Sequence, residues 1–400
     1  MLPEGWKEIF LGNILDFKNG LNADKAAYGH GCKFVNVMDV INNTIIKHEN
    51  IIGKVNTTAK NIDLFKLKYG DILFNRTSET KEEIALSSVY MDHSLAVYGG
   101  FVIRGRPKNS NINTDFSLYF FQSPSFRNQA IKSAQGVVRA NIGQDSLSRI
   151  LLPLPPLPEQ KKIAAILSTW DRAIEGTEKL LANSQQQKKA LMQQLLTGKK
   201  RLPGFTGEWK KTNIGNIAKE ISIRNKNRKN YPVISCTKTK GFVDSLSFFN
   251  KKVYSDDLSG YKIISRNQIG FPSNHVEEGS IGLQNLHDDA IVSPIYTVFS
   301  MEENADPLFV FAVLKTDHYR QIFAAATNSS VDRRGSLRWS AFSQIKINLP
   351  SLPEQQAIAA VLTTADEEIT TIESDLSRLR QEKKALMQQL LTGKRRVKVD

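Results

Sequence analysis

Two long stretches of the chain carry apolar residues at alternating steps of three and four. They begin with the same four letters, LPEQ, at residues 157–160 and 352–355. This spacing places the apolar positions along one helix face and predicts a coiled-coil seam in each stretch. The predicted apolar seam positions are Ile163, Leu167, Trp170, Ile174, Leu181, Leu191 and Leu195, then Ile358, Leu362, Ile369, Ile372, Leu376, Leu379, Leu386 and Leu390.

Both stretches also have helix boundaries in their sequence. Pro158 and Pro353 suit a first helical turn, and the glutamate that follows each favours the positive end of the helix dipole. Gly198 and Gly393, followed by lysine and arginine, are typical of a helix end. Each helix is expected to be roughly 55–60 Å long at about 1.5 Å per residue.

The two stretches are copies of one another. They align without a gap at an offset of 195 residues, and the eleven letters KKALMQQLLTG are identical in both. A weaker repeat precedes each copy, since Trp6 and Gly12 have the same spacing as Trp209 and Gly215. Between these openings and the LPEQ stretches the two halves diverge. We therefore predict a domain at 1–157, a helix at 158–200, a second domain at 201–352 and a second helix at 353–400.

One helix cannot bury such a stripe alone, so the other copy is the natural partner. Antiparallel pairing is preferred because it makes the two halves equivalent under a pseudo-two-fold axis. The globular segments are expected to be mixed α/β (α+β), with short strands at 33–37, 70–74 and 267–271 and helices at 116–122 and from 307. The predicted fold class is thus two mixed α/β domains separated by a long antiparallel two-helix coiled coil, with an internal repeat.

The charge balance favours a polyanionic partner. The chain has 54 Lys and Arg against 40 Asp and Glu, a formal charge of +14, and cations that neutralise phosphates release counterions from nucleic acid. Cys32 and Cys236 have no neighbouring Cys or His at metal-ligand spacing, so we expect no metal site and no disulfide. The sequence has no signal peptide and no uncharged stretch that could span a bilayer, which predicts a cytoplasmic protein without membrane contact.

These residues resemble a known family. Two domains that open with a Trp-Lys pair and (L/I)GNI, and close with LPxLPEQ and a helix ending in LLTGK(K/R)R, are similar to specificity subunits of Type I restriction–modification enzymes. The resemblance covers essentially the whole chain. It implies that residues 1–157 and 201–352 are target-recognition domains, each contacting one half of a bipartite double-stranded DNA site. It also implies that the shared helices set the half-site spacing.

The resemblance implies partners as well. Two methyltransferase subunits and restriction subunits are expected to assemble with this chain, and S-adenosylmethionine and ATP are expected on those partners. This chain is expected to bind no cofactor and to have no catalytic site. In agreement, the sequence has no (N/D)PP(Y/F/W) tetrapeptide and no GxxxxGK[ST] phosphate loop. A coiled-coil adaptor that binds proteins, and a free-standing enzyme with an unfamiliar site, stay open as alternatives.

Candidate DNA-binding residues are chosen by chemistry, because arginine suits guanine, asparagine suits adenine and cations suit phosphates. They lie after a predicted strand, before the closing segment of each domain, and in the basic run at 224–229. For each of them, a solvated surface residue is the alternative. The candidates are Asn75, Arg76, Arg139, Asn141, Arg224, Lys226, Arg228, Lys229, Asn274, Arg333, Arg334 and Arg338.

Overall fold

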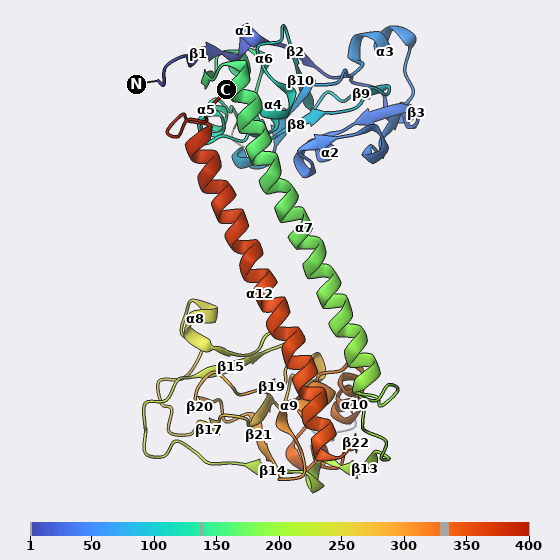
Figure 1. Cartoon of the computed structure of the whole chain (residues 1–400), viewed down its shortest axis with the longest axis vertical. Helices are drawn as coiled ribbons and strands as arrows, with labels where there is room; N and C mark the ends of the chain where they lie inside the picture. Colours follow the sequence, from blue (N-terminus) through green and yellow to red (C-terminus); the bar gives the residue numbers. More distant parts are fainter. Residues whose placement is uncertain (1, 137–138, 329–335, 400) are drawn as a thin grey trace. The chain divides into compact units, whose positions relative to one another are not determined.

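The computed structural model describes residues 2–136, 139–328 and 336–399 (Figure 1). The chain divides into two units. Unit 1 contains residues 1–179 and 374–400, and unit 2 contains residues 180–373. In the described part of the chain, no helix is both long and apolar enough to cross a membrane.

Unit 1 is built on a five-stranded sheet in the order β2-β10-β6-β8-β4, in which β10 is antiparallel to both of its neighbours. A three-stranded sheet, β5-β3-β9, and two strand pairs, β1-β12 and β11-β7, complete it. The strands are β1 Lys7–Phe10, β2 Leu15–Asn19, β3 Tyr28–Val35, β4 Ile45–Ile46, β5 Lys54–Val55, β6 Ile72–Asn75, β7 Thr77–Ser78, β8 Ser87–Tyr90, β9 Ala96–Tyr98, β10 Val102–Pro107, β11 Ala140–Asn141 and β12 Leu151–Leu154. The short helices are α1 Leu11–Ile14, α2 Val37–Asn42, α3 Ala59–Phe65, α4 Thr114–Phe120, α5 Pro124–Lys132 and α6 Gln144–Ser148.

Unit 2 repeats the central part of this arrangement. Its four-stranded antiparallel sheet has the order β14-β21-β18-β19, and three strand pairs, β13-β22, β15-β16 and β17-β20, surround it. The strands are β13 Lys210–Asn213, β14 Ala218–Ile221, β15 Ile234–Thr237, β16 Gly241–Asp244, β17 Lys262–Ser265, β18 Ile269–Pro272, β19 Gly282–Leu283, β20 Asp289–Val292, β21 Tyr296–Met301 and β22 Lys346–Leu349. The short helices are α8 Ser245–Phe249, α9 Pro307–Leu314, α10 Asp317–Asn328 and α11 Trp339–Phe342.

Two helices of 39 residues each, α7 (Leu157–Leu195) and α12 (Leu352–Leu390), contribute one part to each unit. Within unit 1, Glu178 of α7 pairs with Arg380 of α12, and the earlier Asp171 pairs with the later Lys383. The order of these contacts makes the two helices antiparallel. The same relationship holds within unit 2, where Ser184 contacts Glu368 and the later Lys188 contacts the earlier Asp366.

The helix ends belong to the domain cores. Ile163 and Leu167 of α7 and Leu390 at the end of α12 are buried in the main core of unit 1, together with Trp6. Leu195, Ile358 and Leu362 are buried in the corresponding core of unit 2. The predicted fold class, with mixed α/β domains, an internal repeat and antiparallel long helices, is therefore confirmed.

One expected strand is shorter than predicted. The run 33–37 was expected to be extended throughout, but β3 ends at Val35 and α2 begins at Val37. Asn36 accounts for the change, because its side chain accepts hydrogen bonds from the main-chain nitrogens of Met38 and Asp39, and the Asp39 carboxylate accepts one from Asn36 N. This capping box stabilises a helix start where hydrophobicity alone suggested a strand.

Candidate nucleic-acid interface

Two candidate segments of the first domain, separated by more than sixty residues, meet in a two-stranded ribbon. Strands β7 and β11 pair antiparallel, with Thr77 opposite Asn141, and the Thr77 Oγ1 and Asn141 Oδ1 atoms are 2.6 Å apart. The ribbon continues from Arg76, whose carbonyl accepts a hydrogen bond from Ile142 N at 3.0 Å. Sequence reasoning identified both segments but gave no reason for them to be neighbours.

The two arginines of this ribbon differ in how they are held. The Arg76 side chain is partly exposed and donates from Nη1 to the carbonyl of Gly100 at 3.2 Å. Arg139 is exposed, and its Nη2 lies 4.0 Å from a carboxylate oxygen of Glu79, which is also exposed. An exposed pair at this distance adds little stability, so phosphate or a base edge can replace Glu79 at low cost.

Asn75 does not fit the predicted role. Its side chain is 0% exposed, donates to the carbonyl of Glu83 at 2.9 Å and accepts from Thr77 N at 3.3 Å. A fully buried amide cannot reach a base edge. The prediction of DNA contact is therefore wrong for Asn75, which instead holds the turn that carries Arg76.

Sequence reasoning missed Phe101. Its main-chain carbonyl accepts from Arg76 N at 2.9 Å, which places it beside the ribbon, and its side chain is 63% exposed. The signal was available only after folding, because residue 101 follows a Gly-Gly turn far from residue 76 in the sequence. An exposed aromatic ring beside arginine suits apolar contact with a base.

The second domain repeats the backbone arrangement with other side chains. The carbonyl of Ser273, just after β18, accepts a hydrogen bond from Leu337 N at 2.8 Å, as Arg76 does from Ile142. Asn274 is half-buried, and Arg338 is exposed at the N-cap of α11. The structure thus brings the Asn274 and Arg338 segments together. Arg333 and Arg334 lie outside the described residues.

The basic run at 224–229 is an exposed loop held from within. Asn225 is 2% exposed, and its side chain donates to the carbonyl of Lys229 and accepts from Lys229 N, both at 2.9 Å. Arg228 has a φ of +52° and its guanidinium is 4.0 Å from the carboxylate of Asp257. Four cations of the loop, Arg224, Lys226, Arg228 and Lys229, are exposed.

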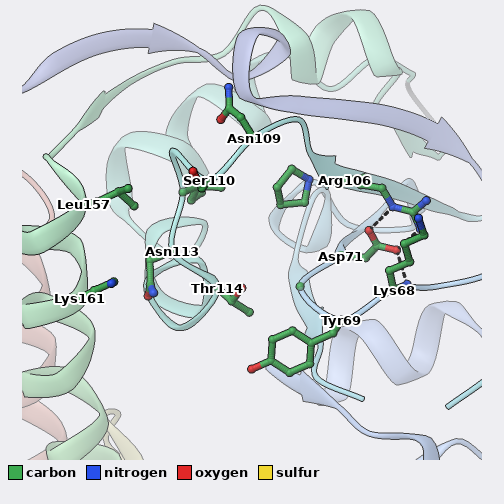
Figure 2. Close-up of a pocket in the computed structure, with 13 residues that line it drawn as sticks. Lys68, Tyr69, Asp71, Arg106, Asn109, Ser110, Asn113, Thr114, Leu157 and Lys161 are labelled. Atoms are coloured by element: carbon green, nitrogen blue, oxygen red, sulfur yellow. Dashed lines mark hydrogen bonds and ion pairs between the residues drawn. The ribbon is translucent and has the colours of Figure 1, made fainter. Parts of the chain in front are cut away.

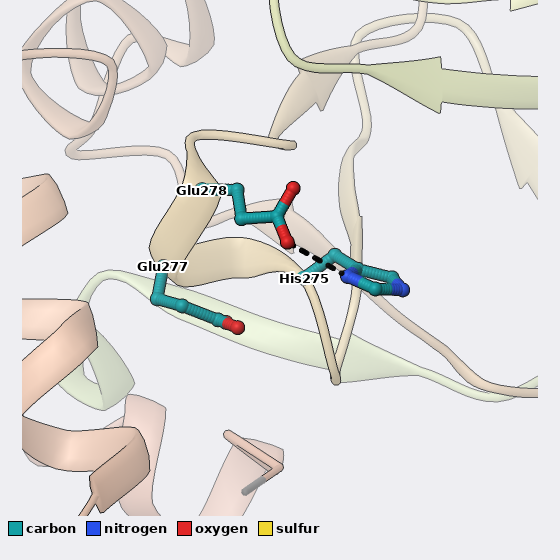
Figure 3. A group of neighbouring side chains, drawn as sticks. All are labelled: His275, Glu277 and Glu278. Atoms are coloured by element: carbon teal, nitrogen blue, oxygen red, sulfur yellow. Dashed lines mark hydrogen bonds and ion pairs between the residues drawn. The ribbon is translucent and has the colours of Figure 1, made fainter.

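A cluster of potential metal ligands, His275, Glu277 and Glu278, lies in the loop that follows β18 in the second domain. The nitrogen and oxygen atoms that could bind a metal are within 4.8 Å of one another (Figure 3). His275 Nδ1 is 3.3 Å from the Glu278 carboxylate, and both side chains are exposed. Figure 3 marks the contact between His275 and Glu278 and draws none to Glu277. The cluster is explained by one exposed His–Glu contact in a turn, and we assign it no ligand.

The predicted seam positions are all buried or partly buried. In unit 1 the least exposed are Ile163, Leu167, Leu376 and Leu390, and the partly buried ones are Trp170, Ile174, Leu379 and Leu386. In unit 2 the least exposed are Leu195, Ile358, Leu362 and Ile372, and the partly buried ones are Leu181, Leu191 and Ile369.

Two lysines occupy equivalent seam positions, and each meets an aspartate of the other helix. Lys188 pairs with Asp366 in unit 2, and Lys383 pairs with Asp171 in unit 1. Asp171 also accepts a hydrogen bond from the Tyr119 hydroxyl at 2.6 Å, and the Lys383 ammonium lies 5.4 Å from the centre of the Tyr119 ring. The Tyr119 contact ties the first domain to the helices, and burial beside Asp171 raises the pKa of Tyr119.

A second pair of equivalent contacts joins the helix ends, and we call them the junction pairs. Arg396 binds Glu159 through Nε and Nη2 at 2.7 and 3.0 Å in unit 1, and Arg201 binds Glu354 at 2.5 and 2.6 Å in unit 2. The glutamates are only 2% and 1% exposed. Each carboxylate raises the pKa of its arginine through these hydrogen bonds. The sequence suggested only helix-dipole roles for these four residues, so this interpretation was incomplete.

The two junction pairs differ in their tryptophan. Trp6 donates from Nε1 to Glu159 Oε2 at 2.9 Å. Trp209 Nε1 is buried and has no hydrogen-bond partner within the described residues, although the Arg201 guanidinium lies 6.0 Å from its ring centre. Next to these rings, Gly198 and Gly393 have φ values of +69° and +71°, and an added Cβ would approach Trp209 to 3.3 Å and Pro3 to 2.4 Å. Both glycines are therefore favoured by their positive φ, and at Gly393 the close approach of Pro3 leaves no room for a Cβ either.

The glutamine of each LPEQ sequence binds the domain that precedes it. Gln160 accepts from Asn113 N at 2.8 Å, and Gln355 accepts from Asp306 N at 2.9 Å. Both glutamines are 0% exposed. Asn113 and Asp306 are the N-caps of α4 and α9, so each glutamine connects the start of a long helix to the start of a domain helix.

A cavity of about 580 Å³ in unit 1 lies where the domain meets the start of α7 (Figure 2). Its lining includes Lys68, Lys161 and Arg106, and the Arg106 guanidinium is bound by the buried Asp71 at 2.7 and 2.6 Å. The corresponding cavity of unit 2 has a volume of about 370 Å³, and its charged lining residues are Arg266, Glu302, Glu303 and Asp306. Because the two cavities differ in charge, a ligand common to both halves is not expected in them.

The geometry of two equivalent halves agrees with comparisons to known proteins. The family model of the Type I restriction modification DNA specificity domain matches the chain twice, at residues 3–183 and 207–379. The chain belongs to this family. The resemblance found in the sequence is confirmed, and so is the non-catalytic role, because the members of this family named below are specificity subunits.

Similar proteins are matched over nearly their whole length. The chain is 26% identical to the putative Type I restriction enzyme MjaX specificity subunit of Methanocaldococcus jannaschii, covering 99% of this chain and 95% of the relative. It is 28% identical to the Type I restriction enzyme MjaVIII specificity subunit of the same organism, covering 99% and 94%. The crystal structure of a Type I system S subunit from M. genitalium matches with a TM-score of 0.57 at 15% identity, covering 96% of both chains. The chain is thus a DNA-specificity subunit of a Type I restriction–modification system.

Proposed function

We propose that each half of the chain recognises one half of a bipartite double-stranded DNA site. The observation that carries this proposal is the repeated backbone contact after β6 and after β18, from Ile142 to Arg76 and from Leu337 to Ser273. The same scaffold therefore displays different side chains in the two halves. That is the arrangement needed to recognise two different short sequences.

In the first half, we propose that Arg76, Arg139 and Asn141 contact bases or phosphates, with Phe101 beside them. In the second half, Asn274 and Arg338 are the proposed counterparts, and Arg333 and Arg334 remain candidates by sequence. The loop cations Arg224, Lys226, Arg228 and Lys229 are proposed to contact phosphates, because they are exposed and clustered.

We further propose the division of labour along the chain. Residues 1–157 and 201–352 are the target-recognition domains, and residues 158–200 and 353–400 are the shared helices that set the distance between the half-sites. The shared sequences of the helices suit two identical methyltransferase subunits, with restriction subunits completing the nuclease in the cytoplasm. S-adenosylmethionine and ATP bind to those partners in this proposal, and the chain itself needs no cofactor.

The test is to co-express the chain with its methyltransferase subunit in a host without adenine methylation and to map modified adenines across the genome. The expected result is one split motif, two short defined blocks around a fixed unspecified spacer. Replacing residues 1–157 by those of a relative should alter one block and leave the other intact. A stable complex that produces no new methylation would contradict the proposal and favour a protein-binding adaptor.

A further inference from the structure

In both halves, one cation binds two main-chain carbonyls of the loop that follows the candidate recognition segment. In unit 1, Arg127 donates from Nη2 to the carbonyl of Glu82 at 2.6 Å and from Nη1 to that of Ile84 at 2.7 Å. In unit 2, Lys315 donates from Nζ to the carbonyls of Gly279 and Ile281 at 2.8 and 3.3 Å.

The four carbonyls occupy equivalent places. Arg76 and Ser273 correspond, because each accepts the hydrogen bond from the closing segment of its domain. Glu82 follows Arg76 by the same number of residues as Gly279 follows Ser273, and the same holds for Ile84 and Ile281. Both isoleucine side chains are 0% exposed, so each loop returns to the core at the point where the cation holds it.

The cations themselves come from different places in the fold. Arg127 lies within α5, whereas Lys315 is the C-cap of α9. Arg320 of α10 lies near the loop, since its Cδ is 3.8 Å from where a Cβ on Gly279 would be, but its guanidinium pairs with Asp317 at 3.1 Å. The same contact is therefore made twice by unrelated residues, which indicates that the positions of the carbonyls matter rather than one inherited side chain.

Both cations have an unusual set of partners. Within the described residues, no carboxylate pairs with Arg127 or Lys315, and Lys315 adds only a third carbonyl, that of Lys238 at 2.9 Å. Burial lowers the pKa of each. Taking a charge out of water without a counterion is costly, and charge-assisted hydrogen bonds to several carbonyls offset part of that cost. The result is a loop fixed at two points.

We propose that Arg127 and Lys315 are positioning residues for DNA recognition, each fixing the loop that supports the recognition segment of its own half. In unit 1 the fixed loop includes Glu83, whose carbonyl binds Asn75 and whose carboxylate binds Ser78, directly beside Arg76. In unit 2 the fixed loop begins at the turn of Asn274 and His275. This inference rests on the proposed function, because it assigns a role within half-site recognition.

The test uses the full chain with its methyltransferase subunit and compares methylation motifs genome-wide. Arg127→Gln should relax the block recognised by the first domain, and Lys315→Gln should relax the other block. A discrimination loss of about tenfold at one or more positions is expected, which is typical of one displaced base contact. The conservative variants Arg127→Lys and Lys315→Arg should restore part of it. Lys132→Gln and Arg320→Gln are matched controls that remove a charge without touching the carbonyls, and both blocks should stay intact.

The outcomes separate this inference from the proposed function. If the wild-type chain yields no split motif, the proposed function fails, and the inference fails with it. If the wild type yields the motif but the variants lose methylation equally at all sites, or keep both blocks unchanged, only the positioning role is overturned. If thermal melting shows that the glutamine variants do not fold, Arg127→Lys and Lys315→Arg serve as the test, because each keeps the charge but moves the donor atoms. A partly relaxed block in the half that carries the substitution supports the positioning role. A motif unchanged in both blocks overturns it.

Discussion

Glu159 and Arg396 are 237 residues apart in sequence, yet they form a two-point ion pair with N–O distances of 2.7 and 3.0 Å. The carboxylate is almost fully buried, while 43% of the Arg396 side chain is exposed. Arg396 also donates to the carbonyl of Glu4 at 3.0 Å. This junction pair therefore connects the start of α7, the end of α12 and the beginning of the chain.

Arg396→Ala should destabilise unit 1, because it leaves the Glu159 carboxylate buried with Trp6 as its remaining side-chain donor among the described residues. Denaturant unfolding of the full chain, followed by fluorescence, measures this loss. Glu159→Gln in the Arg396→Ala background should recover part of it by removing the unpaired charge. Additive effects of the two changes would contradict a direct coupling.

Asn75→Ala should lower the stability of the first domain by about 1–3 kcal/mol, since the carbonyl of Glu83 and the amide of Thr77 lose their buried partner. Asn274→Ala is the comparison in unit 2, because that side chain is only half-buried, and it should cost less. Thermal melting of both variants checks the order. If Asn75→Ala lowers the melting temperature no more than Asn274→Ala does, the buried amide of Asn75 has no special stabilising role.

Arg76→Ala should change sequence preference rather than stability. If the guanidinium contacts a base, discrimination at one position of one half-site should fall by about 1–3 kcal/mol. Methylation mapping of the variant complex measures this effect, and Lys108→Ala serves as a control for loss of an exposed charge on the same domain. Uniform weakening at all sites would instead assign Arg76 to a phosphate.

Lys226→Ala should weaken binding to every duplex. It should also make the slope of log K against log salt concentration less steep by about 0.9, because each phosphate contact releases about that many counterions from the DNA. Titrations of the chain with cognate and random duplexes at several salt concentrations give the slope. Lys226→Arg keeps the charge and should preserve it. A slope that does not change in Lys226→Ala would remove this residue from the interface.

The seam of the long helices was predictable because a period of 3.5 residues directly marks which face of a helix is apolar. Every predicted seam residue from Ile163 to Leu390 has reduced exposure in the structure. The junction pairs were not predictable in this way. Periodicity gives a face but not the stagger between two helices, and only the stagger decides that Glu159 meets Arg396 rather than a neighbouring cation.

The candidate interface was predictable in composition but not in detail. Arg76 and Asn141 were identified by residue type, yet their proximity depends on strand pairing between distant segments. For Asn75 the residue type was misleading. An asparagine amide can bind either a base edge or the main chain of a turn, and only the burial of the side chain in the structure distinguishes these two roles. Arg127 and Lys315 had no sequence signal, since carbonyl acceptors are present at every residue.

The division of the chain has a consequence for its synthesis. Unit 2 is one continuous segment, 180–373, whereas unit 1 needs residues 374–400 in addition to 1–179. Domains fold as units while the chain leaves the ribosome, usually from the N-terminus onward. Here the order of completion is inverted, because the domain translated first is complete only after residues 374–400 have been made, among them Arg396, the partner of its buried Glu159 carboxylate. A nascent chain that extends only to residue 373 would contain all of unit 2 and an incomplete unit 1.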